Sequence, residues 1–406
     1  MFRPSPPPSG AESHVRARGN VLALAACQAL SMSGAVLTIS VSALAGEALA
    51  VNKALATVPF ALQFAMSMMS TVPASLLMGR IGRRAGFTVG QTIGILAALI
   101  AAFGIFQGSF AVFALGSALL GIHNAFWQYL RFAAAEVADE SFRPQAISYV
   151  LAGGLIAALV GPEIAKATRD LFAPVLFAGC YLAIVPLCLL NIAVLRFVRI
   201  PRVPASVSTG RGLGHIVREP VFLVAVLSAM IGYGAMNLVM TATPLAMHSA
   251  HFDFSDSAFV IQWHVLGMFA PSFITGHLIR RFGAPVIVIA GAFAMVLSVG
   301  TNLAGGTLWN YWFGLVLLGI GWNFMFIGGT MLLTEVHRPE ERARVQALND
   351  FLVMSMVTFS SFASGAIHHA LGWTAVNLGI VVPVLVAFAA AVWLVLLRRR
   401  KRQAVT

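Results

Sequence analysis

A set of polar and aromatic residues between positions 123 and 131 has the spacing of one broad helical face. The set, mostly three or four residues apart, is His123, Asn124, Trp127, Gln128 and Arg131. Because polar groups are costly inside an apolar helix, they face a cavity or a neighbouring helix. Indole and amide groups together suit a flat, partly apolar organic solute. The alternative is interhelical hydrogen bonding or, for Trp127 and Arg131, anchoring at a membrane interface.

Three other apolar runs carry similar side chains. We predict that these runs add six residues to the same substrate site. The first run contributes Gln28, the second Tyr233 and Asn237, and the third Trp322, Asn323 and Phe326. Tyr233 and Asn237 are four residues apart and share a helix face. For an isolated residue such as Gln28, a hydrogen bond between helices is the simpler interpretation.

Few titratable residues lie within the apolar runs. Glu163 and His264 are the candidates for proton coupling, and His123 also titrates near neutral pH. Alternatively, Glu163 reaches the surface and pairs with Lys166 or Arg169. The sequence has no paired carboxylates, no metal-spaced His/Cys cluster and no phosphate-binding glycine loop. We therefore predict no enzyme, no cofactor and no metal.

The composition requires lipid as the solvent for most of this chain. Of 406 residues, 59% are hydrophobic and 10% are charged, against about 25% charged in a typical soluble domain. Apolar runs of about 20 residues are long enough to cross a bilayer as helices. The net charge of +12 comes from short clusters between these runs. We therefore expect membrane lipid and a small-molecule substrate as partners, and no nucleic acid.

Twelve apolar runs predict an all-α membrane protein with twelve transmembrane helices. The predicted spans are 20–45, 55–78, 87–106, 110–130, 146–165, 173–195, 221–247, 258–279, 284–303, 308–333, 347–367 and 373–397. The polar segment 197–219 divides them into two six-helix bundles, 20–196 and 220–397. Tails 1–19 and 398–406 flank the bundles.

The distribution of positive charge predicts the orientation. With both termini in the cytoplasm, 23 of the 26 Lys and Arg residues fall in cytoplasmic segments. Such a bias is what the positive-inside rule requires, and adding or removing one span would scramble it. Localisation to the cell (inner) membrane, with many spans, follows.

The two halves also repeat in sequence. Leu119–Ile122 reads the same as Leu317–Ile320, and Arg80–Gly82 resembles Arg281–Gly283. The offsets are about half the chain. Two parallel halves related by an axis along the membrane normal are a transporter architecture.

The segment Ser75–Arg84 and its weaker copy Gly276–Gly283 resemble the basic loop of the major facilitator superfamily. The likeness extends over essentially the whole chain. It implies a central cavity lined by the first, fourth, seventh and tenth helices, with function as a monomer. Two positions depart from the pattern, because Ser75 replaces a glycine and Gly79 replaces an acid.

The resemblance also implies a cytoplasmic gate built from charged residues. Its candidate members are Arg80, Arg83, Arg84, Glu136, Arg280, Arg281, Glu335 and Asp350. Because the acid is missing from position 79, we predict that Asp350 faces Arg80 or Arg83 instead. The alternative is that Asp350 only caps its own helix.

The remaining gate residues are expected to pair within each repeat. Glu136 would pair with Arg83 or Arg84, and Glu335 with Arg280 or Arg281. We expect such pairs to form when the cavity faces outward and to break when it opens inward. Their alternative role is that of solvated charges at helix ends.

The stretch Gln128–Glu136 resembles a bacterial permease subgroup that includes riboflavin transporters. This likeness implies secondary active uptake of a vitamin-like aromatic solute such as riboflavin. The superfamily resemblance implies protons as the coupling ion, and facilitated diffusion is the alternative. Gly161 and Pro162 are similar to a signature of antiporters, so efflux of drugs or metabolites is an alternative. A non-transporting membrane receptor is an alternative of another class.

Overall fold

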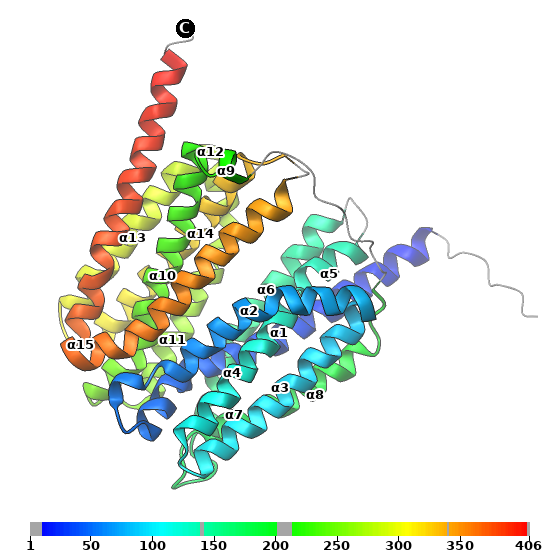
Figure 1. Cartoon of the computed structure of the whole chain (residues 1–406), viewed down its shortest axis with the longest axis vertical. Coiled ribbons are helices and arrows are strands. Elements are labelled where there is room, and N and C mark those ends of the chain that lie inside the picture. Colours follow the sequence, from blue (N-terminus) through cyan, green and yellow to red (C-terminus); the bar gives the residue numbers. More distant parts are fainter. Residues whose placement is uncertain (1–9, 139–141, 201–212, 339–340, 404–406) are drawn as a thin grey trace, which may run out of the picture.

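The computed structural model describes residues 10–138, 142–200, 213–338 and 341–403, and within them every regular element is a helix (Figure 1). The elements of the first half are α1 (Gly10–Leu49), η1 (Lys53–Leu55), α2 (Val58–Ile81), α3 (Arg83–Phe106), α4 (Phe110–Trp127), α5 (Leu130–Val137), α6 (Arg143–Thr168), α7 (Ala178–Leu182) and α8 (Ile184–Leu195). Those of the second half are α9 (Leu213–Ile216), α10 (Pro220–Ser249), α11 (Phe254–Phe269), α12 (Ser272–Phe282), α13 (Ala284–Leu303), α14 (Leu308–Thr334) and α15 (Arg342–Gln403).

Among the described residues, nine helices are long and apolar enough to cross a membrane. The pair α11 and α12, bent by 40°, makes a tenth if it is one span. The longest helix, α15, consists of two arms, because Gly372 lies between them with φ 77° and ψ −175°. That backbone conformation suits glycine, which has no Cβ to clash there.

Each of the twelve predicted spans lies mostly on helix, but several boundaries or shapes differ; the second helix begins only at Val58 and the sixth only at Ala178. The first helix begins at Gly10, well before position 20. The fourth span breaks after Trp127 and resumes at Leu130, and the sixth divides into α7 and α8. The eighth bends between α11 and α12, where Pro271 cannot donate a backbone hydrogen bond. Most of the predicted linker, 201–212, lies outside the described residues.

The halves 10–200 and 213–403 meet at one end of the molecule and separate toward the other. Figure 1 shows α2 and α6 converging with α10 and α15 near the kink of α15 and diverging from them at the opposite end. The buried clusters follow this arrangement. One shared cluster joins Val36 and Phe60 to residues of the second half. Toward the separated end, one cluster belongs only to the first half and another only to the second.

Hydrogen bonds and a carboxylate–imidazole contact join the halves at their closed end, which carries η1 and Gly372. The Thr57 hydroxyl donates to the carbonyl oxygen of Ser361 at 2.7 Å and accepts from the backbone N–H of Gly365 at 3.1 Å. Nearby, the carboxylate of Glu47 lies 3.3 Å from Nδ1 of His248. These contacts bridge residues about 200 to 300 positions apart, and they define the closed end.

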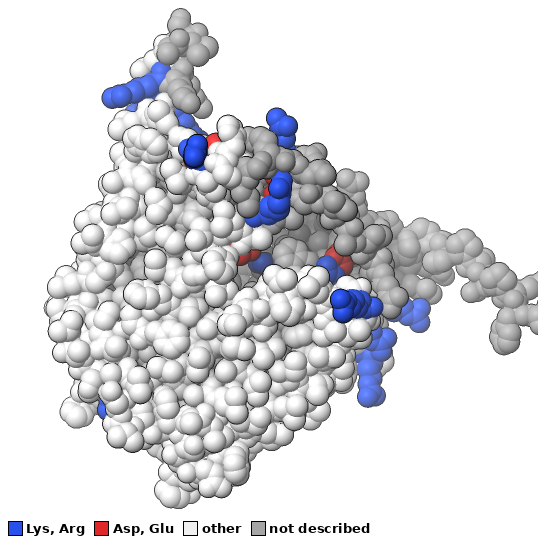
Figure 2. All heavy atoms as spheres, viewed as in Figure 1, with Lys and Arg blue, Asp and Glu red and all other residues white. Residues whose placement is uncertain are grey.

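The other end is rich in arginine, and we call it the arginine-rich end. It carries Arg80, Arg83, Arg84, Arg131, Arg280, Arg281 and Arg398. Figure 2 shows blue side chains gathered there, and a hollow between the two halves with charged groups inside it. The remainder of the visible face is nearly free of charge, as a surface in contact with lipid requires.

Candidate functional site

Four aromatic side chains of the second half form one cluster in the middle of the molecule. The rings of Trp322 and Phe326, on α14, are stacked with 5.2 Å between centroids and 8° between planes. Tyr233 of α10 meets them edge-on at 5.3 and 5.6 Å, and Phe269 of α11 lies 5.9 Å from Trp322. Three of these residues, Tyr233, Trp322 and Phe326, were predicted for the substrate site. The structure brings them together.

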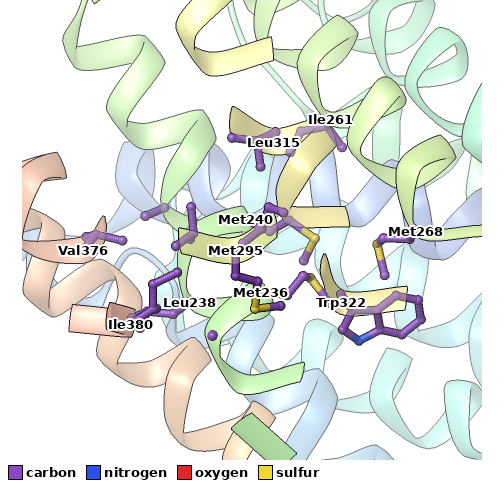
Figure 3. Close-up of a cluster of buried hydrophobic side chains, with 14 of the residues drawn as sticks. Met236, Leu238, Met240, Ile261, Met268, Met295, Leu315, Trp322, Val376 and Ile380 are labelled. Carbon is purple, nitrogen blue, oxygen red and sulfur yellow. The ribbon is translucent and has the colours of Figure 1, made fainter. Parts of the chain in front are cut away.

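This aromatic cluster lies where the two halves meet. Phe64 of α2 packs against the same small buried cluster as Tyr233 and Phe326. Figure 3 shows Trp322 at one edge of the largest buried cluster, in which several methionines take part. The indole N–H of Trp322 is buried and has no hydrogen-bond partner. A donor at the edge of an aromatic surface suits a flat solute that carries a carbonyl group.

Arg131 lies on α5 of the first half, at the arginine-rich end. Its guanidinium lies 4.8 Å from the centre of the Phe132 ring, and its side chain is exposed. Arg131 is the arginine of the first half that lies nearest in electrostatic terms to Tyr233 and Asp350 of the second half.

The predicted ion pair between Asp350 and Arg80 or Arg83 is not formed. Arg83 is occupied by Glu136, and the carboxylate of Asp350 accepts a hydrogen bond from the amide of Asn349 at 3.1 Å. Asp350 is exposed at the arginine-rich end, where the halves are separated.

The remaining residues of the predicted stripe on α4 turn toward the first half. The indole N–H of Trp127 donates to Oδ1 of Asn124 at 3.0 Å, and the Gln128 amide donates to the hydroxyl of Ser67 at 3.0 Å. His123 is buried, and its Nδ1 donates to the carbonyl of Gly90 at 2.9 Å. The break after Trp127 removes Arg131 from their common helix face, which the spacing alone did not reveal.

Two amides predicted for the substrate site are used between helices instead. The Asn237 amide nitrogen donates to groups of α15, including the hydroxyl of Ser361 at 2.6 Å. That of Asn323 donates to the carbonyl of Met268 at 2.6 Å. Both residues are fully buried, and we therefore assign them to helix packing. Gln28 is also buried, and its amide lies 3.5 Å from the sulfur of Met32.

Arg83 and Glu136 form the ion pair predicted for the first half. Nε of Arg83 donates to one carboxylate oxygen at 2.5 Å, and a second guanidinium nitrogen donates to the other oxygen. The pair joins α3 to α5 and is intact although the halves are separated at this end. The expectation that opening breaks it is wrong, because both partners belong to the same half.

For the second half, the predicted partner of Glu335 is wrong. Glu335 accepts from a guanidinium nitrogen of Arg398, near the end of α15, at 2.6 Å. Arg280 and Arg281 lie exposed at the end of α12, and Arg281 stacks over Phe282 with 5.2 Å to the ring centre. The basic tail follows the last span directly, so helical extension of α15 carries Arg398 to Glu335.

The two residues proposed for proton coupling differ in their surroundings. Glu163 is exposed and pairs with Lys166 at 2.8 Å, which is the surface alternative. Its assignment to proton coupling is therefore withdrawn. His264 is fully buried, with Nδ1 donating to the carbonyl of Leu315 at 2.7 Å and with Nε2 lacking a partner.

Sequence reasoning missed two groups of residues. Phe64 and Phe269 were hidden among 29 phenylalanines, and only tertiary contacts single them out. Gln63 and Gln91 are isolated amides in apolar runs, which is a signal that could have found them. Both line a small cavity with His123.

Comparisons with known proteins agree with this architecture. The model of the Major Facilitator Superfamily matches residues 22–361. The chain is 40% identical over 365 residues to the riboflavin transporter RfnT of Brucella anthropi, covering 89% of this chain and 92% of the relative. It is 29% identical over 325 residues to the uncharacterized MFS-type transporter YddS of Bacillus subtilis, covering 72% of each.

A solved structure shares the fold at low sequence identity. The crystal structure of a D-xylose-proton symporter superposes with a TM-score of 0.73 and 15% identity, covering 92% of this chain and 97% of that one. The family match spans most of the chain, and the helices are those of a membrane-embedded bundle. This chain therefore belongs to the major facilitator superfamily and is a multi-pass membrane transporter of a small molecule, not an enzyme.

Proposed function

We propose that this protein carries riboflavin, or a closely similar flat aromatic solute, into the cell by alternating access. The observation that supports it most is the aromatic cluster of Tyr233, Phe269, Trp322 and Phe326 at the meeting point of the halves. The isoalloxazine ring of riboflavin is flat, with carbonyl oxygens at its edge. Aromatic faces and the unpaired indole N–H of Trp322 match those two features.

The similarity to a riboflavin transporter supports the same substrate. We further propose twelve spans. These are the nine helices above with each arm of α15 counted as one span, the bent pair α11 and α12 as one more, and α6 as the last. Both termini and the arginine-rich end would then lie in the cytoplasm, as the positive-inside rule requires. In that orientation the structure is open to the cytoplasm. The proposed unit is a monomer, and the proposed coupling ion is the proton.

Closure of the cytoplasmic end would bring Arg131 and Asp350 together. They lie on opposite halves, Arg131 on α5 and Asp350 on α15. A pair between them would take the place of the latch that the family builds from the acid missing at Gly79. Substrate bound on the aromatic cluster would then be enclosed between the closed end and this pair.

Growth of a riboflavin auxotroph tests the proposal. Expression of the protein should rescue growth at riboflavin concentrations too low for the parent strain, and Trp322→Ala should reduce the rescue. Trp309→Ala is the matched control, because Trp309 lies on the same helix and is exposed away from the cluster. Absence of rescue by the wild-type protein at normal membrane levels would refute riboflavin uptake. Raised resistance to lipophilic cations in its place would indicate efflux.

A further inference from the structure

The last helix extends beyond its neighbours at the arginine-rich end. Figure 1 shows the final turns of α15 rising past the ends of α12 and α13. These turns carry the basic run Arg398–Arg402, and the sequence has no Asp or Glu between positions 351 and 406. Consecutive cations on one helix repel one another. A bound anion would therefore stabilise this segment.

The protein itself supplies one anion, and that anion pairs with Arg398. The carboxylate of Glu335 accepts from the Arg398 guanidinium at 2.6 Å. Arg398 continues the buried face of the helix, because it lies four residues after Leu394, which is 1% exposed. Within the described part of the chain, no carboxylate forms an ion pair with Arg399 or Arg400. Their charges are left for another partner.

Arg400 continues a different face of the helix, which is exposed along the second arm of α15. Apolar residues three or four positions apart form a stripe on this face. The stripe comprises Val382, Leu385, Val386, Ala389, Trp393 and Leu396. Arg399 and Arg400 follow Leu396 by three and four residues. Since an exposed apolar stripe on a membrane-spanning helix contacts lipid chains, the two arginines lie next to lipid.

The two arginines lie at the depth of the lipid headgroups. At a rise of about 1.5 Å per residue, Arg400 is about 6 Å beyond Leu396 along the helix axis. The headgroup layer on each side of the hydrocarbon is roughly 5–8 Å thick. Trp393, 47% exposed on the same face, is of the residue type enriched where these two layers meet. The phosphate of a lipid that contacts the stripe would therefore lie level with both guanidinium groups.

We propose that Arg399 and Arg400 bind the phosphate of an anionic phospholipid whose acyl chains lie against the exposed stripe of α15. Arginine suits this ligand, because its planar guanidinium donates two parallel hydrogen bonds to a phosphate group. Contact between the acyl chains and the stripe favours a membrane lipid over free phosphate. An anionic headgroup is favoured over a zwitterionic one, which carries its own cation. This lipid site is independent of the solute that the protein transports.

Trp393 can report on this lipid, since it lies on the same face about 10 Å from Arg400 along the helix. The protein is reconstituted in phosphatidylcholine vesicles in which a fixed minor fraction of the lipid carries bromine on its acyl chains. This brominated lipid is either phosphatidylglycerol, which is anionic, or phosphatidylcholine. Bromine quenches the fluorescence of nearby tryptophan. The signal of Trp393 is obtained by subtracting that of the same protein with Trp393→Phe.

We expect the anionic brominated lipid to quench Trp393 more strongly, with a binding preference of about fivefold or more. Each basic residue near an anionic surface contributes about fivefold. The double variant Arg399→Gln, Arg400→Gln should reduce the preference to less than about twofold. The double variant Arg399→Lys, Arg400→Lys keeps both charges and should keep most of the preference.

The matched control is the double variant Arg196→Gln, Arg199→Gln. It removes two exposed arginines from the first half, beside the buried cluster at the same end of the molecule. This control should keep the preference, because it changes the net charge equally but leaves α15 intact.

Three results would overturn the proposal. The first is equal quenching of Trp393 by the two brominated lipids in the wild-type protein. The second is an undiminished preference in the variant Arg399→Gln, Arg400→Gln. The third is loss of the preference in sodium phosphate but not in sodium chloride of the same ionic strength, which would indicate a site for free phosphate.

Discussion

Thr57 offers a direct way to alter the balance between the two orientations of the cavity. Its side chain is fully buried at the closed end, where its hydroxyl makes two hydrogen bonds to α15. Thr57→Val keeps the shape and β-branching of the side chain but removes both bonds. Because those bonds join opposite halves, they exist only while this end is closed.

The magnitude follows from the number of bonds lost. A hydrogen bond contributes about 0.5–1.5 kcal/mol net, so two contribute about 2 kcal/mol to the closed arrangement of this end. Since about 1.4 kcal/mol is a factor of ten in an equilibrium constant, Thr57→Val should shift the balance roughly 30-fold toward opening of this end. Thr57→Ser keeps the hydroxyl and should shift it far less.

Distances between spin labels measure this shift. Cysteines introduced at the exposed residues Val51 and Leu371 place one label on each half near the closed end, and the three native cysteines are buried. Thr57→Val should increase the population of long distances, and Gly365→Ala should do the same, because its added Cβ would lie 2.7 Å from Oγ1 of Thr57. An unchanged distance distribution in both variants would refute the argument that this contact closes the end.

Three further predictions concern the opposite end and the helix packing. Glu136→Gln should lower the stability of the purified protein by about 1–3 kcal/mol in a melting assay, because it leaves the half-buried Arg83 without its carboxylate. The double variant Arg83→Glu, Glu136→Arg should recover part of the loss. If the double variant instead loses as much as the two single variants together, the pair does not stabilise the protein. Asp350→Asn should leave the KM of uptake within about twofold of wild type and lower the maximal rate of uptake. An unchanged maximal rate would show that Asp350 takes no part in the proposed closure with Arg131. Asn323→Leu should destabilise the protein by several kcal/mol in a melting assay, since it leaves buried groups of α11 and α12 unpaired, and melting at the wild-type temperature would show that this residue is not part of the packing.

Much of the fold followed from one physical constraint on the sequence, the length of an apolar run that can cross a bilayer as a helix. Apolar runs long enough to cross a bilayer predicted where most of the helices lie, although the run 173–195 begins five residues before its helix. The ends of the helices were harder to predict. Helix α1 extends into a polar stretch, and α15 continues past the last apolar residue to Arg398 and beyond. Hydrophobicity measures contact with lipid, whereas a helix can continue into water through its own backbone hydrogen bonds.

The candidate site was predicted in part, and the reason lies in helix rotation. The residues Tyr233, Trp322 and Phe326 meet as expected. Asn237 and Asn323, close to them in sequence, point to neighbouring helices instead. Sequence shows that an amide in a membrane helix needs a partner. Whether that partner is a substrate or another helix depends on packing that the sequence alone does not reveal.

The charged residues show a second limit. The pair of Arg83 and Glu136 was predictable because both positions belong to the repeated motif. The partner of Glu335 was not, since Arg398 lies beyond the repeat in a tail with no counterpart in the first half. Likewise, the position of Asp350 depends on how far the halves are separated, which is a property of the conformation.

Exchange of riboflavin by the purified protein is the most direct test of the central claim, that the aromatic cluster binds a flat solute between two moving halves. In proteoliposomes loaded with unlabelled riboflavin, wild-type protein should take up labelled riboflavin. Trp322→Ala should raise the KM of this exchange about five- to tenfold, as expected for the loss of about 1 kcal/mol or slightly more of aromatic contact. The control Trp309→Ala should leave KM unchanged. Exchange that is absent in wild type, or equal in Trp322→Ala and wild type, would contradict the account.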